Sequence, residues 1–143
     1  MKILVTGGCG YVGTRLVLEL IKKSNELTVF DSQWFGNYLP SNKGIEIIQG
    51  DIRDLSPLKN KTFDIIIHLA NIANDPAVDL NPTLSWEVNV LAGYRLAEFA
   101  GQCGSRQLIF ASSGSVYGFK EEPRVTEDLD LVPISYYNKT KMV

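Results

Sequence analysis

Three side chains near the carboxyl end of the chain have the types and spacing needed for proton transfer. Tyr137 and Lys141 are four residues apart, so on a helix they share one face. A nearby ammonium favours phenolate over phenol, which predicts a lowered pKa for Tyr137. Ser113, just after an apolar run, can hydrogen-bond a reacting oxygen, whereas Tyr136 is followed four residues later by Thr140 and has no such lysine. A Tyr-x-x-x-Lys spacing alone is common, so the assignment depends on a second motif.

That second motif is a glycine-rich turn at the other end of the chain, from Thr6 to Gly13. Gly7 permits a tight turn, Gly10 lets the backbone approach a pyrophosphate, and Gly13 lets helix and strand pack closely. Amides at the start of the following helix, together with its dipole, attract phosphate. No Gly-Lys-Ser/Thr follows, so a nucleoside-triphosphate loop is excluded. The residues expected at the phosphates are Gly7, Gly10, Tyr11, Val12 and Gly13.

Asp31 narrows the ligand to a dinucleotide. It lies 18 residues after Gly13, at the end of a second apolar run, where a carboxylate accepts hydrogen bonds from ribose hydroxyls. Its charge would repel a 2′-phosphate, and residues 32–36 hold no Arg or Lys to offset it. The pattern predicts NAD as the cofactor, although Arg15 keeps NADP open. Lys141 can then donate to the ribose of the nicotinamide half.

The elements that must position these residues alternate along the chain. Strands are expected at 2–6, 26–30, 45–49, 63–69 and 107–111, and helices at 11–23, 81–103 and from about 133. Continuous apolar strands alternating with helices indicate a Rossmann-type, doubly wound parallel sheet covered on both faces, a three-layer α/β/α architecture. Ligands in such sheets bind at the carboxyl ends of the strands. We therefore predict one NAD(P)-binding domain over residues 1–143.

The longest expected helix carries two apolar stripes that should face the core. One is formed by Leu84, Val88 and Leu91, and the other by Val90, Tyr94 and Ala97. The segment 71–76, before this helix, faces the expected cleft. Two interpretations of it stay open: amides that contact a sugar, or a capped loop before a helix.

Composition excludes several classes of function. The net charge is -2 and no run of like charges stands out, which argues against nucleic-acid or anionic-membrane partners. Cys9 and Cys103 have no metal-binding spacing, so no metal is expected and both are interpreted as small apolar residues. The first residues lack the long apolar core of a signal peptide, and no segment is long enough to span a membrane, so a cytoplasmic protein is predicted.

With these residues in hand, the chain resembles the NAD-dependent epimerase/dehydratase family of the extended short-chain dehydrogenases/reductases over essentially its whole length. The matching segments are Thr6–Gly13, Gly50–Asp54, His68–Asn71, Asn89–Val90 and Ser112–Gly118. The resemblance implies that Asp51 and Ile52 surround adenine. It also implies that the backbone of Leu69, Ala70 and Asn71 lines the cofactor. Asn71 replaces the second Ala of the family's His-x-Ala-Ala and offers an added polar contact.

For catalysis, the resemblance places the reactive serine at Ser113 beside Tyr137 and Lys141, and gives Asn89 a part in organising the active site and the cofactor. His68, the only histidine, becomes part of the strand-end framework. The family's 4,6-dehydratases carry an acidic pair where this chain has Gly114–Ser115, so dehydratase chemistry loses its acid and base.

The expectation is an NAD-dependent sugar-nucleotide epimerase or a closely related oxidoreductase acting by reversible hydride transfer. The alternatives are an NAD(P)-dependent reductase or dehydrogenase of a non-sugar alcohol or ketone, and a non-catalytic dinucleotide-binding module. Family members continue past the Tyr-Lys helix into a small substrate domain, so the chain is expected to be truncated and that domain absent. Relatives commonly pair through the two long helices, here 81–103 and the one from about 133, which makes a homodimer the candidate assembly.

Overall fold

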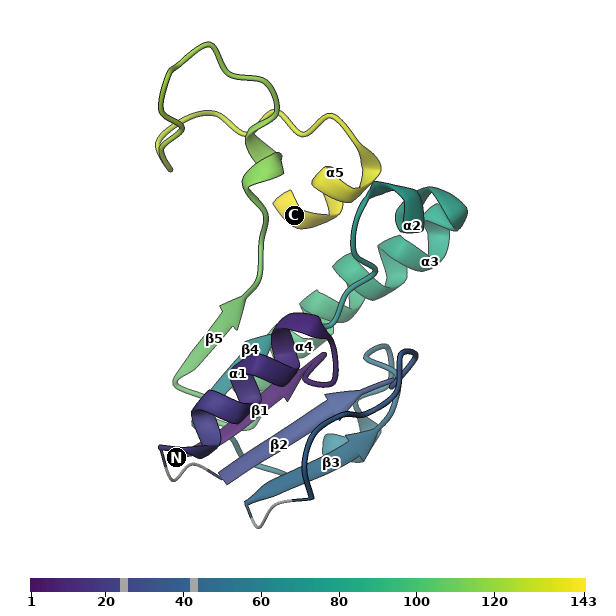
Figure 1. The fold of residues 1–143 in the computed structure, drawn as a ribbon, viewed down its shortest axis with the longest axis vertical. Helices are drawn as coiled ribbons and strands as arrows, with labels where there is room; N and C mark the ends of the chain where they lie inside the picture. Colours follow the sequence, from purple (N-terminus) through teal and green to yellow (C-terminus); the bar gives the residue numbers. More distant parts are fainter. Residues whose placement is uncertain (24–25, 42–43) are drawn as a thin grey trace.

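A computed structural model describes residues 1–23, 26–41 and 44–143 (Figure 1). The strands are β1 (Lys2–Thr6), β2 (Glu26–Asp31), β3 (Ile45–Gln49), β4 (Ile65–His68) and β5 (Gln107–Phe110). The α-helices are α1 (Tyr11–Ile21), α2 (Asp75–Leu80), α3 (Pro82–Trp86), α4 (Ala92–Gln102) and α5 (Tyr136–Met142). Short 3₁₀ turns occur at η1 (Ser56–Leu58) and η3 (Gly114–Tyr117), and a π-helical turn, η2 (Glu87–Leu91), joins α3 to α4.

All five strands are parallel and lie in the order β3-β2-β1-β4-β5. The chain first builds outward from β1 to β3 and then crosses to the other side of β1, so the order reverses between β1 and β4. Thr6, at the end of β1, is in register with both Phe30 and His68. This reversal creates the crevice in which doubly wound sheets bind ligands. The predicted Rossmann-type topology is confirmed.

Side chains alternate along β1 between two separate cores, as the pleat of a strand requires. Ile3 and Val5 face α1, where they pack with Val17, while Leu4 faces the opposite side with Leu96 of α4. Figure 1 shows α1 and α4 on opposite faces of the sheet. The three-layer arrangement is therefore confirmed.

The long helix differs from its prediction in phase. Its buried residues include Val88, Ala92 and Leu96, whereas Leu91 and Tyr94 are 42% and 61% exposed. The wider turn at η2 accommodates an extra residue and shifts the faces of the helix that follows. In the predicted stripes, Leu84, Val88 and Val90 do pack in the core or are buried, whereas the core placement of Leu91, Tyr94 and Ala97 is wrong.

After β5 the chain leaves the sheet and runs to α5, which stands apart from the sheet in Figure 1. Here β5 is an edge strand whose Leu108, Ile109 and Phe110 keep 37–42% of their surface exposed, which contradicts the prediction of a strand covered on both faces. The last helix begins at Tyr136, later than predicted, because Ser135 accepts the Asn138 amide and caps it. In the three described stretches, no helix has the length and apolar character needed to cross a bilayer. A cytoplasmic location stays a prediction.

Candidate functional site

The glycine turn after β1 is built from backbone packed against backbone. Gly7 has a φ of +73°, and a Cβ there would lie 2.5 Å from the amide nitrogen of Ala70. A Cβ on Gly13 would lie 2.3 Å from the carbonyl oxygen of Gly7. At the start of α1, Gly10 is the N-cap and provides no side chain to the first-turn amides. This helix start therefore presents its N–H groups to a bound anion.

A cavity of about 710 Å³ opens in front of this turn, at the carboxyl ends of β1, β2 and β4. Eleven residues predicted to hold a cofactor line it: Gly7, Gly10, Tyr11, Val12, Gly13, Asp31, Asp51, Ile52, Leu69, Ala70 and Asn71. The volume is within the range of small-molecule and cofactor sites. Residues that are far apart in the sequence thus form one site.

Asp31, at the end of β2, ties the glycine turn to the next loop. Its two carboxylate oxygens accept the amides of Cys9, at 3.0 Å, and Gln33, at 2.7 Å. Burial and the Asp31 charge raise the pKa of the Cys9 thiol to about 11, so the thiol stays neutral. The carboxylate lies in the cavity wall, where the sequence placed the ribose acceptor.

An aromatic rim, which no sequence motif predicted, borders the Asp31 side of the cavity. It consists of Trp34, Phe35 and Tyr38, all exposed. The side-chain carbonyl of Asn37 holds this loop by accepting the amide two residues on, at 3.0 Å, and the thiol of Cys9, at 3.6 Å. Three aromatic residues within 34–38, shortly after Asp31, were the available signal.

Asp51, predicted beside adenine, is paired with Arg53. The guanidinium donates to both carboxylate oxygens at 2.7–3.1 Å and also to Glu87 at 2.8 Å. Hydrogen bonds from Arg53 lower the pKa of Asp51, which keeps it ionised. Arg53 thus links the loop after β3 to η2, a role that no sequence pattern predicted.

Asn71 presents an unpaired acceptor at the cavity wall. Its amide nitrogen donates to the carbonyl of Leu69 at 3.0 Å, but its buried Oδ1 has no partner among the described residues. A buried amide oxygen without a donor is costly. A bound molecule with a hydroxyl or amide donor would satisfy it, so this atom fits a ligand in the cavity.

The segment 71–76 resolves into a cap. Asn74 accepts the amide of Ala77 at 3.1 Å and begins α2, so the predicted capped loop is present. Asn71, Ile72 and Ala73 also line the cavity, and a contact of their amides with a sugar stays a prediction.

His68 belongs to the framework. Its Nδ1 lies 2.6 Å from the hydroxyl of Thr6, and its ring is buried against Phe110. Burial and the charge of Lys141 lower the pKa of His68 to about 4, so the ring is neutral near pH 7. This agrees with the structural role predicted for it.

Lys141 is placed differently from its prediction. Its ammonium is buried, donates to the carbonyl of Ala111 at 2.9 Å and lies 5.0 Å from the ring centre of Phe110. Burial lowers the pKa of Lys141 to about 8. Burial and the Asp75 charge raise the pKa of Tyr137, which is the opposite of the predicted direction. The ammonium of Lys141, which was expected to lower this pKa, faces the Ala111 carbonyl instead. Ser113, Tyr137 and Lys141 are not among the residues lining the cavity.

Asn89 connects the cavity loop to α5. Its Oδ1 accepts the amide of Ile72 at 2.7 Å, and its Nδ2 donates to the Ile72 carbonyl at 3.0 Å and the Thr140 hydroxyl at 3.1 Å. The side chain is buried within the protein and does not line the cavity. Its position in a π-helical turn lets it face both elements, which fits an organising role better than direct cofactor contact.

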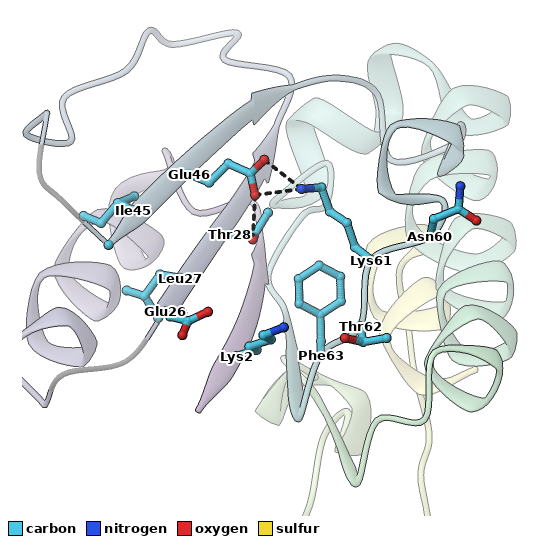
Figure 2. A pocket seen from close by; sticks show the side chains of 11 residues that line it. Lys2, Glu26, Leu27, Thr28, Ile45, Glu46, Asn60, Lys61, Thr62 and Phe63 are labelled. Carbon is cyan, nitrogen blue, oxygen red and sulfur yellow. Dashed lines mark hydrogen bonds and ion pairs between the residues drawn. The ribbon is translucent and has the colours of Figure 1, made fainter.

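A second hollow, of about 490 Å³, lies at the opposite, amino edge of the sheet (Figure 2). Figure 2 shows Lys61 reaching Glu46, with distances of 2.7 and 2.9 Å, while Thr28 donates to the same carboxylate at 3.2 Å. The charges of Lys61 and Glu46 therefore satisfy one another.

Known proteins share both the sequence pattern and the fold. A model of the NAD dependent epimerase/dehydratase family matches residues 3–143. A UDP-glucose 4-epimerase of Lactobacillus helveticus is 32% identical over 147 residues, covering 100% of this chain and 44% of the relative.

Two solved structures have the same arrangement. The UDP-glucose 4-epimerase of Thermus thermophilus, in complex with NAD, matches with a TM-score of 0.88 at 32% identity, covering 99% of this chain and 47% of that one. A UDP-N-acetylglucosamine 4-epimerase from Methanobrevibacter ruminantium, in complex with UDP-N-acetylmuramic acid, matches with a TM-score of 0.91 at 28% identity, covering 99% and 47%. The chain spans a little under half the length of these relatives. Since the family model matches nearly every residue, the chain belongs to the NAD-dependent epimerase/dehydratase family.

Proposed function

We propose that residues 1–143 are the NAD-binding domain and carry the catalytic residues of a sugar-nucleotide epimerase. The observation that carries this proposal is the cavity of about 710 Å³ that unites the glycine turn with Asp31. The solved relative with NAD and the relatives that act on UDP-sugars support it.

The residues of the cavity fit NAD in the order that the chain presents them. The uncapped start of α1 would take the pyrophosphate, and Asp31 the adenosine ribose. Asp51 and Ile52 would border adenine. The unpaired Oδ1 of Asn71 would accept a hydrogen bond from the cofactor. The negative charge of Asp31 favours NAD over NADP.

Bound NAD would accept and return a hydride at the sugar carbon. Tyr137 would take the hydroxyl proton as the hydride leaves, and would return it when the ketone is reduced on its other face. Since burial and Asp75 raise the pKa of Tyr137, the phenolate needs a cation beside it. Lys141, one turn further along α5, would provide that cation and hold the ribose once it turns from Ala111. Ser113 would orient the reacting oxygen.

Neighbouring tyrosines give a matched test. Tyr137→Phe should lower the rate of UDP-sugar epimerisation by about a hundredfold or more, because the proton acceptor is lost. Tyr136→Phe should leave the rate unchanged, since Tyr136 is exposed and its contact with Lys139 is made by the ring, which Phe retains. NAD affinity, measured by calorimetry, should be the same in both.

Equal rates in the two variants would overturn the catalytic assignment. Net consumption of NAD during turnover would favour the second candidate, a dehydrogenase or reductase of another alcohol or ketone. NAD binding without turnover would favour a non-catalytic binding module.

We also propose that two copies pair through the long helix. Trp86, Leu91 and Tyr94 remain exposed along α3, η2 and α4 although they are large and apolar. Surface of this kind often marks an interface. Tyr94→Glu should shift the mass measured by light scattering from two copies to one, and an unchanged mass would argue against this face.

A further inference from the structure

A chain of hydrogen bonds runs from Ser113 into α5. The hydroxyls of Ser113 and Ser115 lie 2.7 Å apart, and the Ser115 amide donates to the Ser113 oxygen at 3.2 Å. The Ser115 hydroxyl in turn donates to Oδ1 of Asn138 at 2.7 Å. Asn138 follows Tyr137 on α5 and is 8% exposed. Its backbone N–H donates to the Ser135 hydroxyl oxygen at 3.1 Å. The network therefore has a fixed inner end.

The chemistry of these groups gives the chain a direction. A carbonyl oxygen only accepts, so Ser115 must donate its one hydroxyl proton to Asn138. Ser115 can then only accept at the other contact, so Ser113 donates to it. The Ser113 oxygen already accepts one amide and keeps one lone pair free. In this state Ser113 offers a ligand an acceptor and no donor.

We propose that Ser115 and Asn138 are positioning residues that set the direction of the Ser113 hydroxyl, so that the site favours an alcohol substrate over its ketone. While Tyr137 is a neutral phenol, as its raised pKa favours, an alcohol can donate its one hydroxyl proton to the free lone pair of Ser113, and that proton goes to Tyr137 only as the hydride leaves. A ketone only accepts, so Ser113 must break its bond to Ser115 before it can donate to the ketone. This inference rests on the proposed function, because it assumes that Ser113 faces the reacting oxygen.

The test uses the NAD-loaded protein with UDP-glucose and measures the reduced fraction of bound cofactor by its absorbance at equilibrium. That fraction reports ketone against alcohol in the site. In Asn138→Leu, the Ser115 hydroxyl loses its acceptor, so Ser113 can donate to the ligand. The ratio of reduced to oxidised bound cofactor should therefore rise about fivefold. Ser115→Ala should give the same rise, since Ser113 loses its acceptor. Asn138→Asp retains an acceptor oxygen and should restore the wild-type ratio.

The double variant Ser115→Ala with Asn138→Leu should show no further rise, because both changes cut one chain. An unchanged ratio in both single variants, or effects that add, would overturn the proposal. A similar rise in Asn138→Asp would also overturn it, since that would point to helix packing as the cause.

Failure of the proposed function would look different. The wild-type protein would then neither reduce bound NAD with UDP-glucose nor epimerise it. The same three variants would in that case be compared by their free energies of unfolding in urea. Losses in the single variants that add up in the double variant would show that no chain joins Ser115 to Asn138, and would overturn the assignment. A double variant no less stable than Asn138→Leu alone would support it.

Discussion

The proposed site has two halves, a cofactor half around the glycine turn and Asp31 and a catalytic half with Ser113, Tyr137 and Lys141. The two halves are held together by different means. On the cofactor side, β1, β2 and the glycine turn pack backbone against backbone, with Leu4, Val5 and Val29 fully buried beneath them. On the catalytic side, β5 is half exposed, and the hydroxyls of Ser112 and Ser115 join the chain after β5 to α5 by hydrogen bonds. The first half is therefore formed by the fold itself, whereas the second depends on individual polar contacts.

This difference predicts how each half responds to change. Substitutions in the cofactor half should damage folding and binding together, because the same backbone contacts serve both. Substitutions in the catalytic half should change chemistry while the fold survives, because a net hydrogen bond contributes only about 1 kcal/mol.

The largest expected effect comes from Gly13→Ala. Its methyl group would lie 2.3 Å from the carbonyl oxygen of Gly7 and 2.6 Å from the Cα of Gly8. Neither backbone atom can move without displacing the turn, so we expect a loss of at least about 4 kcal/mol in the free energy of unfolding. NAD binding should be lost as well, measured by calorimetry at a temperature where the variant is folded.

Gly101→Ala is the matched control. Gly101 lies in α4, and no atom from outside its own helix lies within 4 Å of the place that a methyl group would take. Ala should therefore stabilise the helix by about 0.5 kcal/mol. Similar effects of the two substitutions would contradict the view that the cofactor half is fixed by backbone packing.

Neighbouring strands give the second comparison. Ile66 of β4 is fully buried, whereas Ile109 of β5 is 42% exposed. Ile66→Ala should cost about 3–4 kcal/mol in urea unfolding, and Ile109→Ala about 1 kcal/mol, because less apolar surface is buried there. Equal costs would show that β5 is covered in solution, which would weaken the contrast between the halves.

The same contrast explains what the sequence could predict. The turn from Gly7 to Gly13 and the carboxylate of Asp31 depend on local spacing, and both lie where the pattern predicted. The direction of Lys141 depends on a carbonyl 30 residues away, at Ala111, which helical spacing does not report. The phase of α4 depends on the extra residue at η2, which apolar periodicity also does not show.

The other features that the sequence did not predict also depend on contacts between residues far apart in the chain. Arg53 reaches Glu87 across 34 residues, and Asn138 meets Ser115 across 23. No local pattern marks such pairs. They follow only once the sheet brings the strand ends together.

His68 stands between the halves and gives a pH test. Its pKa is about 4 in the fold against an ordinary 6.5, so between these values the unfolded chain binds a proton that the folded chain does not. Stability should therefore fall as the pH drops from 6.5 to 4, by about 3 kcal/mol for this group. Urea unfolding at several pH values would measure the slope. His68→Phe should remove this part of it, and a slope unchanged in the variant would assign the acid loss to other groups.

The smallest expected effect concerns the choice of cofactor. Asp31→Asn retains a side-chain oxygen for one of the amides of Cys9 and Gln33 but removes the negative charge beside the ribose. NAD should bind about tenfold more weakly, because charge-assisted hydrogen bonds are stronger than neutral ones. The affinity for NADP should fall less or rise, because the 2′-phosphate no longer meets a carboxylate. Calorimetric titration with both cofactors would measure the ratio of the NAD and NADP affinities.

Glu98→Gln, on α4 away from the cavity, makes the same change of charge and should leave this ratio unaltered. If both variants shift the ratio equally, the preference comes from the net charge of the domain. If only Asp31→Asn does, it comes from one carboxylate held at the end of β2 by the same backbone that holds the phosphate turn.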